Sequence, residues 1–152
     1  FDLVNSIKKT YKIQASAADI FVDNLVRHAS GLILFSAAPP GQGGEFHVNE
    51  QPYDYWRRKF APHGYVPCDC IRSQLARHQQ VSFWYRYNTI LYVHGDLLHT
   101  APEDVRASAL QSDAPIRDVS PIWFQLRKLL VQRLPSGTRE WLAQAKARRF
   151  SH

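Results

Sequence analysis

The chain has 152 residues, of which 45% are hydrophobic and 21% charged, with 19 basic and 13 acidic side chains. This length suits one domain with its own core, and 12% aromatic residues exclude a chain that is mostly disordered. No apolar run approaches the roughly 18 residues of a membrane-spanning helix. We expect a processed protein or a fragment of a longer one, because the sequence contains no methionine, even at position 1.

The positive charge is concentrated at one end. Residues 1–122 contain as many acidic as basic residues, so the net charge of +6 comes from residues 123–152. Nucleic acid is therefore not the expected partner of the whole domain, since a basic tail is a surface property. The two cysteines, Cys68 and Cys70, are too close along a strand to pair with each other, which indicates a reduced, cytoplasmic protein.

Hydrophobic patterning predicts four strands and several helices in chain order. Ser16 is the expected N-cap of the first helix and Gly31 its expected C-cap. A helix with Trp56 and Phe60 on its buried side follows Pro52. The predicted strands cover residues 1–7, 32–36, 65–71 and 89–93, and the predicted helices residues 16–28, 52–62, 123–133 and, strongly basic, 139–149.

The first strands alternate with helices, which predicts an α/β fold with a parallel sheet. Four strands make a thin sheet, and its exposed edge at residues 1–7 would be hydrophobic on both faces. This pattern indicates half of a doubly wound domain, with helices packed on the sheet and a basic helical tail.

Residues 37–51 form the best candidate site. This loop follows the carboxyl end of a buried strand, where open α/β sheets bind ligands. His47 could act as a base oriented by Glu50, because an imidazole exchanges protons near neutral pH; the alternative is a histidine that only hydrogen-bonds the loop. Gly41, Gly43 and Gly44 could also cradle a phosphate, although the sequence lacks the Gly-Lys-Ser/Thr of a P-loop.

Two other groups carry weaker signals. His63 with Cys68 and Cys70 does not have zinc-ligand spacing, so we expect no metal site. The aromatic run from Trp84 to Asn88 encloses Arg86, which could stack on RNA bases together with the basic tail; a wall of the core is the alternative that we favour.

Several of these segments together resemble a known family. They are Phe-Ser-Ala-Ala-Pro-Pro-Gly-Gln-Gly-Gly at 35–44, His-Val-Asn-Glu-Gln at 47–51, Tyr55-Trp56, Gly64-Tyr65 and Trp84-Tyr85-Arg86-x-Asn88. The pattern is similar to the C-terminal half of class I S-adenosylmethionine-dependent methyltransferases of bacterial type. It covers residues 1–94. The family has a seven-stranded Rossmann-like sheet in the order 3-2-1-4-5-7-6 with strand 7 antiparallel, and the four predicted strands resemble strands 4, 5, 6 and 7, which lie side by side as 4-5-7-6.

The resemblance implies methyl transfer to a small polar acceptor, such as a sugar. It places Asn5 and Ser6 at the S-adenosylmethionine donor and His47 and Glu50 at the reacting acceptor. The acceptor would be held by the polar loop and by one aromatic wall, that is by Gln42, Gly43, Gly44, Asn49, Gln51, Tyr53 and Trp56. The family's glycine-rich donor loop is absent from these 152 residues, so we expect the isolated chain to bind the donor poorly.

A non-catalytic role is the alternative. The resemblance divides the chain into residues 1–98, the C-terminal half of a methyltransferase-like α/β domain, and residues 99–152, a loop and basic helical tail. On the alternative hypothesis the first part is a non-catalytic interaction domain derived from a methyltransferase, and the basic tail is a contact surface. The strand at residues 1–7 would then pair with a second copy or with a separate N-terminal half.

Overall fold

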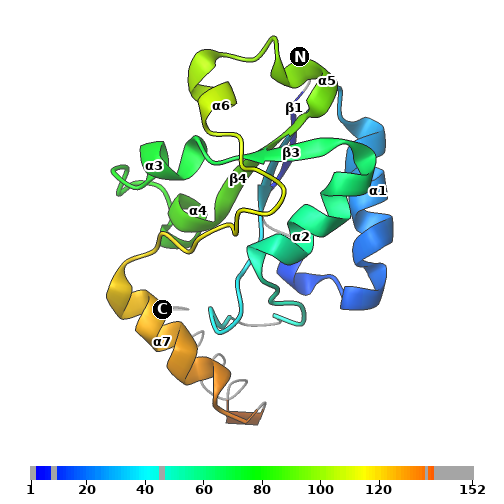
Figure 1. Ribbon diagram of the computed structural model, residues 1–152. Helices are drawn as coiled ribbons and strands as arrows, with labels where there is room; N and C mark the ends of the chain where they lie inside the picture. The colour runs from blue at the N-terminus through cyan, green and yellow to red at the C-terminus, as the bar shows by residue number, and fades with distance from the viewer. Residues whose placement is uncertain (1–2, 8–9, 45–46, 136, 139–152) are drawn as a thin grey trace.

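A four-stranded sheet forms the centre of the computed structural model, which describes residues 3–7, 10–44, 47–135 and 137–138 (Figure 1). The strands lie in the order β1-β2-β4-β3. Their bounds are Leu3–Ser6 for β1, Leu32–Ser36 for β2, Tyr65–Cys68 for β3 and Thr89–His94 for β4. β1 and β2 are parallel, whereas β4 runs antiparallel to both β2 and β3.

The α/β class is therefore confirmed. The sheet is mixed, so the parallel sheet expected from the alternation of strands and helices is wrong, whereas the antiparallel last strand that the resemblance implied agrees with β4. β3 ends and β4 begins at the same end of the sheet, so the connection between them makes no crossover and antiparallel pairing results. The alternation of strands and helices does not reveal this, because short helices occupy the connection just as a crossover helix would. The described sheet has four strands in place of seven, and a Rossmann-like identity is not confirmed.

Helices surround the sheet. They are α1 (Ala18–His28), α2 (Tyr53–Phe60), α3 (Ile71–Leu75), α4 (Phe83–Asn88), α5 (Gly95–Leu98), α6 (Glu103–Ala107) and α7 (Ile122–Gln132), with single 3-10 turns at Thr10–Lys12, Ala15–Ala17 and Ala61–His63. In Figure 1, α1 and α2 lie together on one side of the sheet and α7 extends away from it. The basic helix predicted at 139–149 lies outside the described residues.

Two expected helix caps are wrong. Ser16 lies inside the 3-10 turn that precedes α1, and its side chain caps nothing. Gly31 follows the end of α1 and directly precedes β2, with a φ of 102°. A Cβ atom there would lie 2.2 Å from a methyl carbon of Leu97, so Gly31 serves the close approach of α5 and not a helix end.

Alternating side chains of the strands build two cores. Ile33 and Phe35 of β2 and Ile90 and Tyr92 of β4 face α1 and α2. Around Phe35 the rings of Trp56, Phe60 and Tyr92 have centroids 5.1, 5.1 and 5.9 Å away. On the opposite face, a smaller cluster joins Cys68, Cys70 and Val93 to side chains of α3, α5 and α6.

Two buried arginines hold residues 99–121 against the sheet. Arg57 donates from Nη1 to the carbonyl oxygens of Gln111 and Ser112, at 3.3 and 3.1 Å. Arg72 donates from Nη1 to the carbonyl of Arg117 at 2.8 Å and pairs with Asp69 through its other nitrogens. The segment expected as a loop is thus fixed by main-chain contacts that bring α7 to a defined place.

Replacing Phe35 with Ala should lower the free energy of unfolding by about 3–5 kcal/mol, because it empties the centre of the aromatic core. Urea denaturation measures this change. Ile20→Ala, at a position 65% exposed on α1, is the control and should change stability by less than about 0.5 kcal/mol. Equal losses for the two variants would contradict the packing described here.

Candidate functional site

The loop of residues 37–52 starts at the carboxyl end of β2. β1 ends beside it, since Ser6 pairs in register with Phe35. Thr10 closes this edge by donating a hydrogen bond from Oγ1 to the carbonyl of Ser36 at 2.8 Å. Asn5 is exposed and Ser6 is buried, so the two residues predicted for the donor lie at the same edge as the loop.

Glu50 organises the loop. One carboxylate oxygen accepts from the backbone N–H of Gly41 at 2.9 Å, and the other accepts from the N–H of Gly43 at 2.7 Å. The second oxygen also lies 2.7 Å from Nδ1 of His47. A phosphate would need the same two N–H groups, so the structure argues against the phosphate cradle that the glycine pattern allowed. Residues 45 and 46 lie outside the described residues.

His47 is held in one orientation. Because the Glu50 carboxylate only accepts hydrogen bonds, Nδ1 of His47 is the donor in this contact. The ring lies against Gly44, where a Cβ atom would be 2.3 Å from Nε2. Both side chains are largely buried, with 11% of His47 and 15% of Glu50 exposed. The contact fits the predicted base with its carboxylate and equally the alternative, a histidine that only hydrogen-bonds the loop.

Gln42 points inward, away from the position expected for an acceptor contact. Its side-chain oxygen accepts from Nδ2 of Asn88 at 2.6 Å, and Asn88 Oδ1 accepts from the hydroxyl of Tyr53 at 2.8 Å. Burial raises the pKa of Tyr53 far above its ordinary value, so the phenol stays a hydrogen-bond donor. The three side chains form a buried bridge from the loop through the end of α4 to α2.

Asn49 and Gln51 lie together. Gln51 donates from Nε2 to Asn49 Oδ1 at 2.9 Å, and its backbone N–H donates to the carbonyl of Ala38. Asn49 is 2% exposed, and its Nδ2 finds no acceptor among the described residues. Trp56, predicted as a wall of the site, is 1% exposed and belongs to the aromatic core. The structure therefore brings Asn49, Gln51, His47 and Glu50 together in the loop and keeps Trp56 below it.

Helix α7 supports the loop from outside. A Cβ at Gly41 would lie 2.3 Å from the carbonyl oxygen of Lys128, so only glycine allows this contact between the loop and the helix main chain. Arg127 donates to the carbonyl of Gln42 at 2.9 Å, and Gln132 to that of Pro40 at 2.7 Å. The orientation of α7 is fixed in turn by Lys128, which is 3% exposed and paired with Asp118.

The sequence analysis did not assign Asn88, Arg127 or Gln132 to the site. Their contacts with the loop span 46, 85 and 92 residues of chain. No local motif encodes such distant partners. The only usable signal was the position of Asn88 directly before a strongly predicted strand.

Cys68, Cys70 and His63 have separate surroundings in the structure. Cys68 and Cys70 are free and buried, and burial raises the pKa of Cys68 to about 11, which leaves its thiol protonated and a poor nucleophile. His63 instead pairs with Asp23, with 3.1 Å between Nε2 and Oδ1. No group of three or more metal-ligating side chains occurs in the part of the chain that the structure describes.

The aromatic run before β4 forms helix α4 and packs on α7. The ring of Phe83 lies 4.8 Å from that of Phe124, measured between centroids. Arg86 lies over the rings of Phe83 and Tyr87 at 5.4 and 5.6 Å. These rings already stack on one another, which favours a wall over a surface for nucleic-acid bases.

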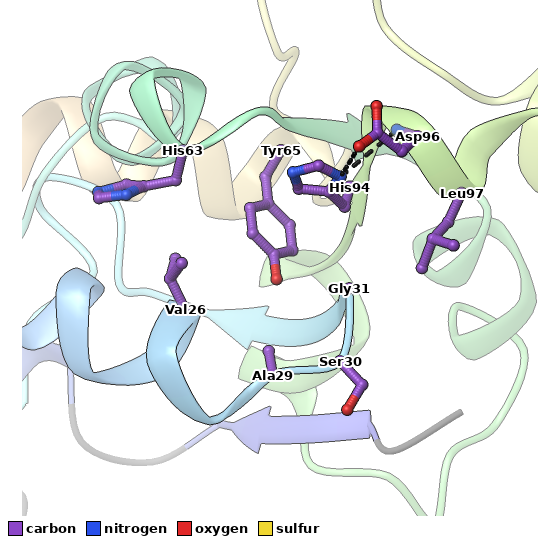
Figure 2. A pocket seen from close by; sticks show the side chains of 9 residues that line it. All are labelled: Val26, Ala29, Ser30, Gly31, His63, Tyr65, His94, Asp96 and Leu97. Atoms are coloured by element: carbon purple, nitrogen blue, oxygen red, sulfur yellow. Dashed lines mark hydrogen bonds and ion pairs between the residues drawn. The ribbon is translucent and has the colours of Figure 1, made fainter.

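A shallow hollow of about 370 Å³ lies at the opposite end of the sheet, near Gly31 at the amino end of β2 (Figure 2). Tyr65 and His94 project into it, and His94 contacts Asp96 at 3.5 Å. The remaining lining residues are Val26, Ala29, Ser30, His63 and Leu97. None of the predicted site residues lies there, so the hollow is separate from the 37–52 loop.

Comparison with family models, curated proteins and solved structures found no match to this chain. The methyltransferase resemblance therefore stays a prediction. Within the described residues, no helix has the length and apolar character needed to cross a membrane.

Glu50→Ala should lower the free energy of unfolding by about 1–3 kcal/mol, because it leaves two backbone N–H groups without their acceptor. It should also speed hydrogen exchange at the Gly41 and Gly43 amides. Denaturation and amide exchange measure the two effects. Glu103→Ala, at a carboxylate that is 80% exposed, is the matched control; unchanged protection of both glycine amides in Glu50→Ala would refute the assignment.

The Asp118–Lys128 pair should make stability acid-sensitive. Burial raises the pKa of Asp118, but hydrogen bonds from Lys128 and Ser120 outweigh burial and hold it below the ordinary value of 3.8. The pair's contribution is therefore complete above pH 3.8 and is lost as the pH falls through the lower folded-state pKa. Asp118→Asn should be less stable than the parent at neutral pH, and urea midpoints should converge on acidification. A difference independent of pH would contradict this account.

Proposed function

We propose that this chain is the second half of a class I S-adenosylmethionine-dependent methyltransferase domain, and that the 37–52 loop takes a small polar acceptor such as a sugar. The arrangement of the strands supports the first part. A parallel pair, β1 and β2, is followed by β4 running antiparallel between β2 and β3. Strands 4, 5, 7 and 6 of that family would lie in this way.

The observation that carries the acceptor site is the Glu50-centred loop. Its carboxylate fixes His47 at 2.7 Å and two loop amides at the same time. Held by Glu50, His47 is the group that would take the proton of an acceptor hydroxyl as the oxygen receives the methyl group and the S–CH₃ bond of the donor breaks. Glu50 would stabilise the resulting imidazolium. Positioning supplies most of the rate in such a transfer.

The chain provides one edge of a donor site. Asn5 is exposed at the carboxyl end of β1 and lies beside the origin of the loop, which fits contact with a polar part of the donor. S-adenosylmethionine, when bound, supplies a methyl group activated by its sulfonium. The family's glycine-rich loop and acidic ribose contact are not present in these 152 residues. Two buried unpaired cysteines support a cytoplasmic setting.

S-adenosylhomocysteine should bind the chain weakly, with a millimolar Kd, because only one edge of its site is present. Amide chemical shifts recorded during a titration test this, and the changes should concentrate at Asn5, Ser6 and residues 37–51. His47→Gln should preserve these changes, since it acts on the acceptor. Shifts confined to other parts of the chain, or none at millimolar ligand, would overturn the proposal.

A non-catalytic interaction domain is the second candidate, favoured by the edge position of β1. Leu3 is 49% exposed there, and β1 pairs on one side only within the described sheet. Light scattering should then report a dimer that Leu3→Lys dissociates, because an edge lysine opposes strand pairing. A monomer with the donor-dependent shifts above would favour the enzyme instead.

A further inference from the structure

Helix α7 exposes an apolar surface that the proposed function does not use. Five large side chains point outward, and we call them the α7 face. They are Ile122, Trp123, Leu126, Leu129 and Leu130, with exposed fractions of 76, 59, 57, 52 and 64%. The residues recur at the spacing of one side of a helix, so they form a continuous stripe. A stripe of this kind marks an interaction surface.

The protein itself fixes this face outward. α7 buries only Phe124 and Lys128, and Lys128 is tied to Asp118 and Ser120. Phe124 packs on Phe83 of α4. A rotation of the helix that buried the leucines would expose the Lys128–Asp118 ion pair and separate the rings of Phe124 and Phe83. In Figure 1 the helix extends away from the sheet, and each of the five side chains of the stripe is more than half exposed.

The positive charge of this part of the sequence indicates which kind of partner binds the α7 face. α7 contains no acidic residue; Lys128 is buried against Asp118 and Arg127 contacts the loop, whereas Arg133, directly after the helix, is exposed. Residues 123–152 carry seven basic residues and one acidic residue, while the rest of the chain is balanced. A second copy would bring two sets of cations together, which opposes self-association through this face. An anionic lipid surface would attract the cations and could also bury the apolar stripe.

We propose that the α7 face docks the protein peripherally on anionic lipid bilayers. A helix that exposes tryptophan and leucines within a basic segment lies in the plane of the headgroups, with its apolar side chains among the upper acyl chains and the cations near the anionic headgroups. Trp123 suits this interface, because its ring is amphipathic. The same helix contacts the loop at Pro40, Gly41 and Gln42 from its inner side, so docking holds the loop next to the membrane.

Flotation of the full chain with vesicles tests the proposal. Binding should be strong to phosphatidylcholine vesicles that contain phosphatidylglycerol, weak to phosphatidylcholine alone, and should decrease as salt is added. Trp123→Ser combined with Leu126→Ser should reduce binding about tenfold or more, since each side chain loses its apolar burial. Ile20→Ser combined with Val48→Ser is the matched control, at positions 65 and 60% exposed, and should bind like the parent.

Each other outcome overturns the proposal. Equal binding to neutral vesicles, or equal loss in both double variants, excludes anionic docking through this face. Dimers that dissociate in the α7 variant would assign the face to a second copy. Circular dichroism of both variants should match the parent, because each of the four substituted side chains is more than half exposed.

Discussion

The antiparallel insertion of β4 between β2 and β3 is the constraint on which the rest of the structure depends. β3 reaches the sheet only through β4, and the two cores share β4 residues on opposite faces. Its first residues follow Asn88, so the strand also sets the buried bridge to Gln42 and Tyr53. The candidate loop is therefore positioned by a strand that comes well after it in the sequence.

The longer elements were predictable from local patterns, but the strand predicted at residues 65–71 is too long, since β3 ends at Cys68 and α3 begins at Ile71. Leu32–Ser36 is a strand as its apolar run indicated, and the helices around Trp56 and Phe124 lie within two residues of their expected bounds. The direction of β4 was not predictable from the same patterns, because apolar alternation carries no information about which end of the sheet a strand enters. The cap expected at Ser16 failed for a related reason: a short 3-10 turn competes with a helix start on the same polar sequence.

In the candidate site too, contacts within the loop were predictable from the sequence, whereas contacts with distant residues were not. His47 and Glu50 lie three residues apart, and their contact follows from spacing within one loop. The glycines were expected for their flexibility, whereas the structure uses Gly41 for contact with a helix that comes much later in the chain. Arg127 and Lys128 looked like members of a basic tail. Arg127 instead donates a hydrogen bond to the loop, and Lys128 is buried. Tertiary packing gives these neighbouring basic residues different surroundings, which the sequence does not show.

The two cysteines give the fold an internal reporter. Cys68 is fully buried at the end of β3, and Cys70 is 9% exposed just beyond it. A thiol reagent can reach Cys68 only when the side chains of α3, α5 and α6 that pack over it move away. The rate of alkylation therefore measures how often this part of the fold opens. The protein thus carries, without any added label, a reporter of local opening at the edge strand of its sheet.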